Sequence, residues 1–142
     1  MSLWFKPYTV EDVPIARGLQ RHLGIEITEI GEDYVRARMP VEERVHQPYG
    51  ILHGGASVVL AETLGSIGSM LAVDPEKFSC VGQEINANHI RSVSSGYVTG
   101  TARPLHIGRS SQVWDIRIVD ERDRLVCVSR ITLFVQSRTA AG

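Results

Sequence analysis

One stretch of the sequence is apolar on almost every side, and the rest of the chain is organised around it. Within residues 56–72 Glu62 is the one charged residue, and the other positions are apolar or small. A helix of this composition must be covered on most of its surface, and a carboxylate within it is costly unless it is paired or used. The uncharged run after Glu62 is far shorter than the ~20 residues of a membrane span. We therefore predict a central buried helix and no transmembrane segment.

Strands are predicted on both sides of this helix, because apolar and polar residues alternate there. The pattern occurs before the helix at residues 25–30 and 34–39, and after it at residues 79–93, 97–104, 111–119 and 124–135. In the strand over residues 111–119, for example, Trp114, Ile116 and Ile118 share one face. A short helix is also expected from Thr9, as its N-cap, to about His22.

The connections indicate how the strands are arranged. Short turns join the four later strands, including one at residues 94–96 and a bend at residues 105–110, so consecutive strands should be antiparallel neighbours. Each strand has one apolar face, and the central helix needs cover. A curved antiparallel sheet of about six strands wrapped around one long helix meets both needs. The predicted fold is α+β, in a single domain over residues 1–142.

Composition narrows the class of protein. The chain has 142 residues, 43% of them hydrophobic, and a formal net charge of −1, which is typical of a soluble domain and gives no sign of a nucleic-acid or membrane-surface partner. The first residues lack the apolar core of a signal peptide, so we expect a cytoplasmic protein. Cys80 and Cys127 are interpreted as reduced thiols, because two cysteines form neither a disulfide framework nor a metal-ligand spacing.

The start of the central helix carries the residues with the clearest chemical potential. Gly54 and Gly55 place backbone N–H groups where a helix lacks partners, which suits a developing oxyanion. Glu62 and Ser66 are four apart and share a helix face, and Gln47 supplies an amide just upstream. Structural alternatives stay open for each of them. The glycines could form only a tight turn, Glu62 could pair with an arginine and Ser66 could pack. His53, before the glycines, could be an N-cap.

The spacing of these residues favours a shared site. Eight residues separate Gly54 from Glu62, or about 12 Å at ~1.5 Å per residue, so one carbonyl cannot easily contact both in a single chain. Two antiparallel copies of the helix across a twofold axis would bring Gly54 of one subunit near Glu62 of the other. Gly65 and Gly68 are expected to permit that close approach. The sequence therefore predicts a dimer with two equivalent sites.

Other common sites are excluded by pattern. His53-Gly54-Gly55 is similar to the oxyanion loop of α/β-hydrolases, but the chain has no G-x-S-x-G motif, and Ser57 has no evident triad. The histidines lack metal-ligand spacing, and no phosphate-binding loop or dinucleotide fingerprint is present. We expect no metal and no cofactor.

A second group of polar residues follows the later strands. It consists of His89, Arg91, Ser94, Ser95, Arg103, His106, Arg109 and Ser110. Arginine offers bidentate donors, serine adds hydroxyls, and neighbouring glycines expose backbone N–H groups, a combination suited to phosphate. The alternative is an ordinary solvated edge.

Three segments together are similar to a known family. They read QPYGILHGGASVVLAETLGS (residues 47–66), GQEINANHIRS (82–92) and PLHIGRSSQVW (104–114). They resemble the hotdog-fold acyl-CoA thioesterases, in the branch of the Arthrobacter-type 4-hydroxybenzoyl-CoA and phenylacetate-pathway thioesterases. Within it the likeness is strongest to the group that holds the 1,4-dihydroxy-2-naphthoyl-CoA thioesterase and the enterobactin proofreading thioesterase. It extends from about residue 23 to residue 135.

The resemblance implies homodimers, usually paired into tetramers, with sites at the dimer interface. Glu62 would be the catalytic carboxylate, as nucleophile or as base on water, and the Gly54 N–H would polarise the thioester carbonyl. Gln47 and His53 would position it. The acyl group would contact Ser66, Gly55, Met70 and Val81, and CoA would contact His89, Arg91, Ser94, Ser95, His106, Arg109 and Ser110.

The expected activity is hydrolysis of acyl-CoA thioesters, with a preference for aromatic acyl groups such as hydroxybenzoyl or dihydroxynaphthoyl. One alternative is proofreading hydrolysis of acyl groups from the phosphopantetheine arm of a carrier protein. Another, of a different class, is an acyl-CoA-binding hotdog protein without catalysis, although such a binder has no need of a carboxylate at position 62.

Overall fold

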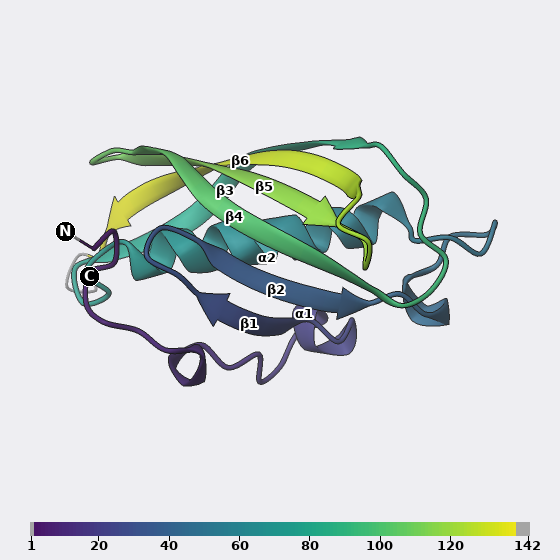
Figure 1. Cartoon of the computed structure of the whole chain (residues 1–142). Coiled ribbons are helices and arrows are strands. Elements are labelled where there is room, and N and C mark those ends of the chain that lie inside the picture. Colours follow the sequence, from purple (N-terminus) through teal and green to yellow (C-terminus); the bar gives the residue numbers. More distant parts are fainter. Residues whose placement is uncertain (1, 139–142) are drawn as a thin grey trace.

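One long helix crosses the concave face of a curved, six-stranded antiparallel sheet in the computed structural model, which describes residues 2–138 (Figure 1). The helix is α2 (Gly54–Leu71). The strands are β1 (Glu26–Ile30), β2 (Val35–Pro40), β3 (Phe78–His89), β4 (Tyr97–Ile107), β5 (Ser111–Val119) and β6 (Leu125–Ser137). The predicted α+β architecture of a sheet around a central helix is therefore confirmed.

The helix is held by side chains that point from the sheet into its buried face. Leu60 and Leu64 are fully buried, and Gly100 of β4 lies so close to Leu64 that an added Cβ would approach the leucine to 2.7 Å. α2 also has the length and composition of a membrane span, but it packs against β2, β3, β4, β5 and β6. Its apolar character is explained by this cover.

The glycines of α2 have a different role from the predicted one. Gly65 packs against Ile131 of β6, and a Cβ at Gly68 would lie 2.7 Å from the Trp114 ring of β5. Both glycines are buried on the side of the helix that faces its own sheet. The expectation that they permit a second helix to approach is therefore wrong, because the sheet already occupies that space.

The strand order differs from the predicted one at a single strand. The order is β1-β2-β4-β5-β6-β3, so β3 lies at the edge beside β6 and not beside β4. The helix carries the chain across the concave face to the far edge, and residues 90–96 then return across the end of the sheet to β4 (Figure 1). The predicted hairpin at residues 94–96 is therefore wrong, although the segment does lead into β4.

The predicted helix over residues 9–22 is also wrong as a single element. It is replaced by a 3-10 turn, η1 (Val10–Asp12), and a short helix, α1 (Leu19–His22). Pro14 disfavours helical backbone at Val13. Thr9 does cap the first turn, since its backbone N–H and hydroxyl both donate to the Asp12 carboxylate, at 2.7 and 3.1 Å.

The strand ends differ in detail. β4 continues past Pro104 to Ile107 with a bulge between Pro104 and His106, so the predicted bend starts later. β3 ends at His89, short of Val93. The loop before α2 contains a 3-10 turn, η2 (Glu43–Val45). Cys80 and Cys127 are both free thiols.

The N-terminal segment is anchored over the C-terminal half of α2. The Trp4 ring stacks on Trp114 with 6.2 Å between centroids, and its indole N–H donates to the Gly31 carbonyl at 2.7 Å. The Phe5 N–H donates to the Leu71 carbonyl at 2.9 Å. Farther along the same segment, residues 12–15 and Gln20 lie beside the helix face that carries Glu62.

Candidate active site

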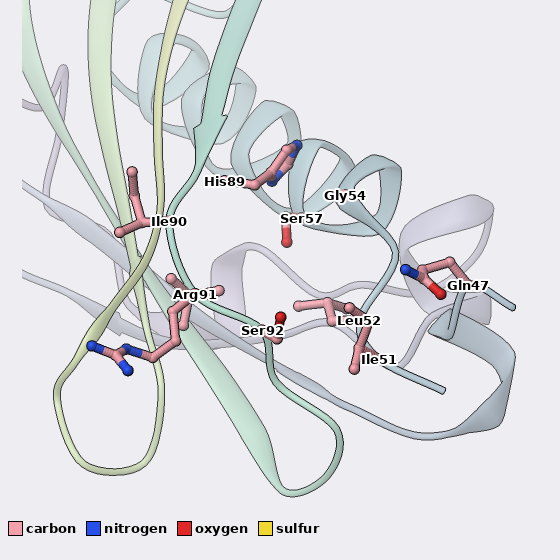
Figure 2. A pocket seen from close by; sticks show the side chains of 10 residues that line it. Gln47, Ile51, Leu52, Gly54, Ser57, His89, Ile90, Arg91 and Ser92 are labelled. Atoms are coloured by element: carbon pink, nitrogen blue, oxygen red, sulfur yellow. The ribbon is translucent and has the colours of Figure 1, made fainter. Parts of the chain in front are cut away.

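A cavity of about 260 Å³ lies where α2 begins and β3 ends (Figure 2). Its lining combines donors from the loop before the helix, the first helical turn and the end of β3. The lining residues are Gln47, Ile51, Leu52, Gly54, Ser57, His89, Ile90, Arg91, Ser92 and Val126. The structure therefore brings together Gln47, Gly54, His89 and Arg91, which the sequence placed in two separate groups.

The first turn of α2 leaves one backbone donor for a ligand. The Gly55 N–H donates to the Nδ1 atom of His53 at 2.8 Å, and the N–H groups of Ala56 and Ser57 donate to the His53 carbonyl at 3.0 and 3.3 Å. Within residues 2–138 the Gly54 N–H has no acceptor. Gly54 is thus the candidate donor to an oxyanion.

His53 caps the helix and is absent from the residues that line the cavity. Its ring nitrogen is occupied by Gly55, and its side chain is exposed. This position confirms the N-cap interpretation. It removes the geometric basis for His53 as a direct contact of the carbonyl within its own chain, and the same bond keeps the Gly55 N–H from substrate.

Gly54 and His89 are in close contact across the cavity. A Cβ at Gly54 would lie 2.6 Å from the Nε2 atom of His89. A glycine is needed there because any side chain would displace the imidazole. Gln47 lies on the other side of Gly54, and its side-chain oxygen accepts the Tyr49 N–H, which leaves its NH₂ group as the free end of the amide (Figure 2).

Ser57 is a cavity residue that the sequence did not indicate. Its side chain is 1% exposed, and its hydroxyl points into the cavity one turn after Gly54 (Figure 2). The sequence offered one usable signal, which is a polar residue three positions after Gly54 on the same helix face.

Glu62 lies in the middle of α2, outside this cavity, and its side chain is exposed. The carboxylate lies over β3, so that a Cβ at Gly82 would approach its Oε1 atom to 2.9 Å. Glu62 forms no ion pair with any group in the described part of the chain. The alternative of a structural acid paired with an arginine is therefore not supported.

A second cavity, of about 490 Å³, opens beside Glu62. One wall is the helix face with Ser66, Met70, Thr63 and Ile67, and the other is the N-terminal segment with Asp12, Val13, Pro14, Ile15 and Gln20. The predicted acyl contacts Ser66 and Met70 therefore do lie beside the carboxylate. The wall of N-terminal residues was not predicted.

Val81 faces away from this cavity. It pairs with Phe134 of β6, and directly paired residues project on the same face of a sheet. Leu133 and Val135, the neighbours of Phe134, are buried toward α2, so Phe134 and Val81 lie on the outer face. The expectation that Val81 contacts the acyl group is therefore wrong for its own chain.

The predicted CoA-binding residues divide into two groups. His89 and Arg91 line the first cavity, and Ser94 and Ser95 line a hollow beside it with residues 120–122 and Arg124.

The second group, His106, Arg109 and Ser110, lies at the β4–β5 turn. This turn is level with Val81, because Ser111 and Val81 both pair with Phe134. Eight residues of β3 separate that level from His89, or about 26 Å at ~3.3 Å per residue. Arg103 pairs with Asp33 at 2.7 Å. One chain therefore does not form the single patch that was expected.

The cysteines are separate from this chemistry. Burial raises the pKa of the Cys80 thiol, and burial also raises the pKa of the Cys127 thiol. Both stay protonated near neutral pH, so neither is an activated nucleophile.

Comparison with known proteins shows which family this sequence is similar to. A family model described as the thioesterase superfamily matches residues 49–127, which include the start of α2, Glu62 and β3. The 1,4-dihydroxy-2-naphthoyl-CoA hydrolase of Listeria monocytogenes is 48% identical over 121 residues, covering 85% of this chain and 98% of its own length. The proofreading thioesterase EntH of Cronobacter turicensis is 47% identical over 135 residues, covering 94% and 98%.

Solved structures agree with the sequence comparison. A crystal structure of a thioesterase from Haemophilus influenzae superposes with a TM-score of 0.94, at 46% identity, and covers 99% of both chains. The sequence and the fold of this chain therefore both resemble those of proteins named as thioesterases.

Proposed function

We propose an acyl-CoA substrate with an aromatic acyl group for this chain, which belongs to the thioesterase superfamily and hydrolyses thioesters. The observation that carries the proposal is the pair of unused groups on α2. The Gly54 N–H is free at the helix start, and the Glu62 carboxylate is free beside a cavity with apolar walls. A donor to the carbonyl oxygen and a carboxylate that acts at the carbonyl carbon, as nucleophile or as base on water, are together sufficient to hydrolyse a thioester.

Two subunits complete each site in this proposal. Gly54 and Glu62 are about 12 Å apart along one helix, at ~1.5 Å per residue, so they serve one carbonyl only across a subunit boundary. Dimers with a twofold axis produce two equivalent shared sites. The support from this chain is the distance itself, together with the absence of Glu62 from the residues around Gly54.

The edge strand β3 is the proposed dimer contact. It is 12 residues long, and its outer side has no partner strand among residues 2–138. A long free edge favours pairing with another strand. Antiparallel pairing of two β3 strands about an axis at Asn86 would set Gly82 opposite His89 of the partner subunit, because the bulge between Gly82 and Glu84 takes Gln83 out of the register. That pair is consistent in face, since Gly82 and His89 pair with the buried Leu133 and Cys127 of β6.

The same register joins the two halves of the site. Glu62 lies over Gly82, and Gly54 lies against His89. Setting Gly82 beside His89 of the partner subunit therefore directs the carboxylate of one chain toward Gly54 of the other. It also moves the β4–β5 turn with Arg109 toward the partner's Arg91, so the two groups of predicted CoA contacts would meet across the interface.

The reaction follows from these positions. The Gly54 N–H binds the thioester carbonyl oxygen, and Gln47 holds the acyl end beside it. Glu62 of the partner subunit then attacks the carbonyl carbon or removes a proton from a water that attacks it. The carbonyl electron pair moves to oxygen, and the collapse of the tetrahedral species breaks the C–S bond. The CoA thiolate leaves and takes a proton, and the acid is released by water in either route. In a single turnover in ¹⁸O-labelled water, label found in the Glu62 carboxylate establishes the nucleophilic route, because general-base catalysis transfers no label to the enzyme.

An aromatic acyl group is supported by the cavity beside Glu62. Val13, Pro14 and Ile15 form one wall, and Ile67 and Met70 form the other. Apolar walls with polar groups such as Ser66 and Gln20 beside them suit a ring that carries hydroxyl groups. The relative named 1,4-dihydroxy-2-naphthoyl-CoA hydrolase acts, by its name, on a CoA ester of a hydroxylated ring.

A carrier-protein substrate is the second candidate, favoured by the 47% identity to a proofreading thioesterase. It would differ in the group that holds the thiol and not in the chemistry at the carbonyl. Activity on an aryl-loaded carrier domain well above that on the matching CoA ester would replace the first proposal. Pairing of dimers into tetramers is also proposed, through the outer face where exposed Val81 and Phe134 lie side by side.

A thiol-release assay on a panel of CoA esters tests the substrate proposal. The panel contains benzoyl, 4-hydroxybenzoyl, 1,4-dihydroxy-2-naphthoyl, hexanoyl and palmitoyl esters. We expect the aromatic esters to give the highest kcat/KM, and Glu62→Ala and Glu62→Gln to lose about 10²-fold or more in kcat. Glu32→Ala is the control, since Glu32 is an exposed acid in the turn between β1 and β2, away from α2 and β3. A preference for hexanoyl or palmitoyl esters would contradict the aromatic assignment.

A further inference from the structure

The Ser57 hydroxyl is a buried polar group of α2 that the reaction above does not use. The side chain is 1% exposed and lines the cavity at the helix start. Its Oγ atom has no hydrogen-bond partner among the described residues, and it points into the cavity (Figure 2). No fully buried side-chain polar atom of the described residues lacks a hydrogen-bond partner, so this Oγ atom is reached from the cavity. A group that enters the cavity can therefore accept its hydrogen bond.

The usual partner of a helical serine is not available to Ser57. Serine hydroxyls in helices commonly bond to the carbonyl four residues earlier. For Ser57 that carbonyl belongs to His53, and it already accepts the N–H groups of Ala56 and Ser57. Ser69, on the same helix, uses the carbonyl three residues earlier, since its buried hydroxyl donates to the Ser66 carbonyl at 2.9 Å, and Ser57 forms no such bond to the Gly54 carbonyl.

The helix start also lacks a second backbone donor. Oxyanion sites generally combine two or more donors aimed at the same oxygen. Gly55 would be the neighbouring backbone donor, but its N–H is held by His53 at 2.8 Å. Ser57 is three residues after Gly54, and residues at this spacing lie on one face of a helix. Ser57 and Gly54 also line the same cavity.

We propose that Ser57 is a catalytic residue whose hydroxyl donates to the thioester carbonyl oxygen beside the Gly54 N–H. The inference rests on the proposed hydrolysis of acyl-CoA. When the C–O bond to the nucleophile forms, the carbonyl electron pair moves to oxygen, and Ser57 and Gly54 bind the oxyanion. When the C–S bond breaks, the pair returns and the thiolate leaves. Ser57 forms no bond to carbon.

Ser57→Ala is the direct test, with Ser69→Ala as a matched control from the same helix. The substrate is whichever ester of the panel is turned over fastest, so a wrong choice of acyl group leaves the test intact. We expect Ser57→Ala to lower kcat by about 10²-fold with KM within about twofold, because one oxyanion donor is worth 10²–10³ in kcat. Ser69→Ala should keep kcat and lose thermal stability instead, since it loses a hydrogen bond made in the folded state.

The other outcomes contradict the proposal. A higher KM with unchanged kcat would place Ser57 in substrate binding alone. A loss as complete as that of Glu62→Ala, with acyl label retained on the wild-type protein at Ser57, would make it a nucleophile. Unchanged kinetics in Ser57→Ala would remove the role, and it would do so while Glu62→Ala remains inactive, which separates this failure from a failure of the proposed function.

A carbonyl-stretch measurement gives a readout independent of turnover. A ¹³C-labelled thioester bound to Glu62→Gln should show a carbonyl frequency lowered by the donors at the helix start. The double variant Glu62→Gln/Ser57→Ala should show a smaller shift, and Glu62→Gln/Ser69→Ala the full shift. Equal shifts in all three proteins would overturn the assignment.

Discussion

His53 closes the start of α2 through Gly55, whose backbone N–H donates to the imidazole Nδ1 atom at 2.8 Å. This bond leaves Gly54 as the free donor of the first turn. His53, whose residue type often acts as a base, is therefore an N-cap here. Because it accepts the Gly55 N–H, the Gly54 N–H is the donor left for a ligand.

The cap predicts a clear contrast between two substitutions of His53. His53→Ala should lower the free energy of unfolding by about 1 kcal/mol, the usual cost of a lost N-cap. His53→Asn keeps an acceptor for Gly55, so it should retain most of the stability and most of kcat. Urea unfolding and steady-state kinetics of both variants check this. Loss of more than about 10²-fold in kcat from His53→Asn would instead indicate acid–base catalysis by the imidazole.

Gly82 is predicted to control the position of the catalytic carboxylate. A Cβ there would lie 2.9 Å from Oε1 of Glu62, and the flexible end of the glutamate can move away at little cost. Gly82→Ala should therefore fold normally and lose about tenfold or more in kcat, because the carboxylate is displaced from its attack position. Gln83→Ala, at the neighbouring exposed position of β3, is the control. Equal activity of the two variants would show that Glu62 does not work from above Gly82.

The free edge of β3 predicts how the dimer can be weakened. Asn86 is exposed near the proposed twofold axis, where two copies would approach each other. Asn86→Glu should raise the dimer dissociation constant by about tenfold or more, since like charges meet across the axis. Specific activity should then fall on dilution. Sedimentation and activity measured over the same concentrations check this, with Thr28→Glu on β1 as the control. A dimer of unchanged affinity would exclude this register.

Asp120 predicts a pH dependence of stability that is separate from catalysis. Burial would raise the pKa of its carboxyl, but the N–H groups of Arg124 and Arg122 and the Arg124 guanidinium outweigh burial and hold the pKa below its ordinary value. A lowered folded-state pKa stabilises the fold above the unfolded-state pKa, and this contribution is lost as pH falls through the folded-state pKa.

Asp120→Asn should accordingly destabilise the protein near pH 7 and have little effect at a pH below the lowered folded-state pKa, where the wild-type carboxyl is also protonated. Urea unfolding at the two pH values measures the difference. A destabilisation that is equal at both would assign it to the lost geometry of the Asp120–Arg124 hairpin and not to charge.

The elements of this fold were largely predictable from periodicity, and their neighbours were not. The range of β5 and its buried face with Trp114, Ile116 and Ile118 follow directly from alternation. The place of β3 at the sheet edge does not, because the short connection at residues 90–96 looks like a hairpin in sequence and yet crosses the end of the sheet. The number of residues between two strands limits how far apart the strands can lie, but it does not determine whether they are neighbours in the sheet.

The candidate site was predictable where chemistry and spacing coincide. Gly54, Gln47 and Glu62 were chosen from residue type, and the spacing of Gly54 and Glu62 is the basis of the two-subunit proposal. Ser57 was missed because a serine in an apolar helix is usually a packing residue, and its lack of a partner is visible only in three dimensions. The glycines of α2 were misassigned because sequence does not show which helix face meets the sheet.

The central claim is that each active site contains Gly54 and Gln47 of one chain and Glu62 of the other, and subunit mixing tests it most directly. Gln47→Ala and Glu62→Ala are each expected to be nearly inactive alone. Mixed, dissociated and reassociated in equal amounts, they form mixed dimers in which one site regains all three residues. Recovery of about one quarter of wild-type activity is predicted, since half the dimers are mixed and each has one intact site. A mixture no more active than its components would show that every site is built within a single chain.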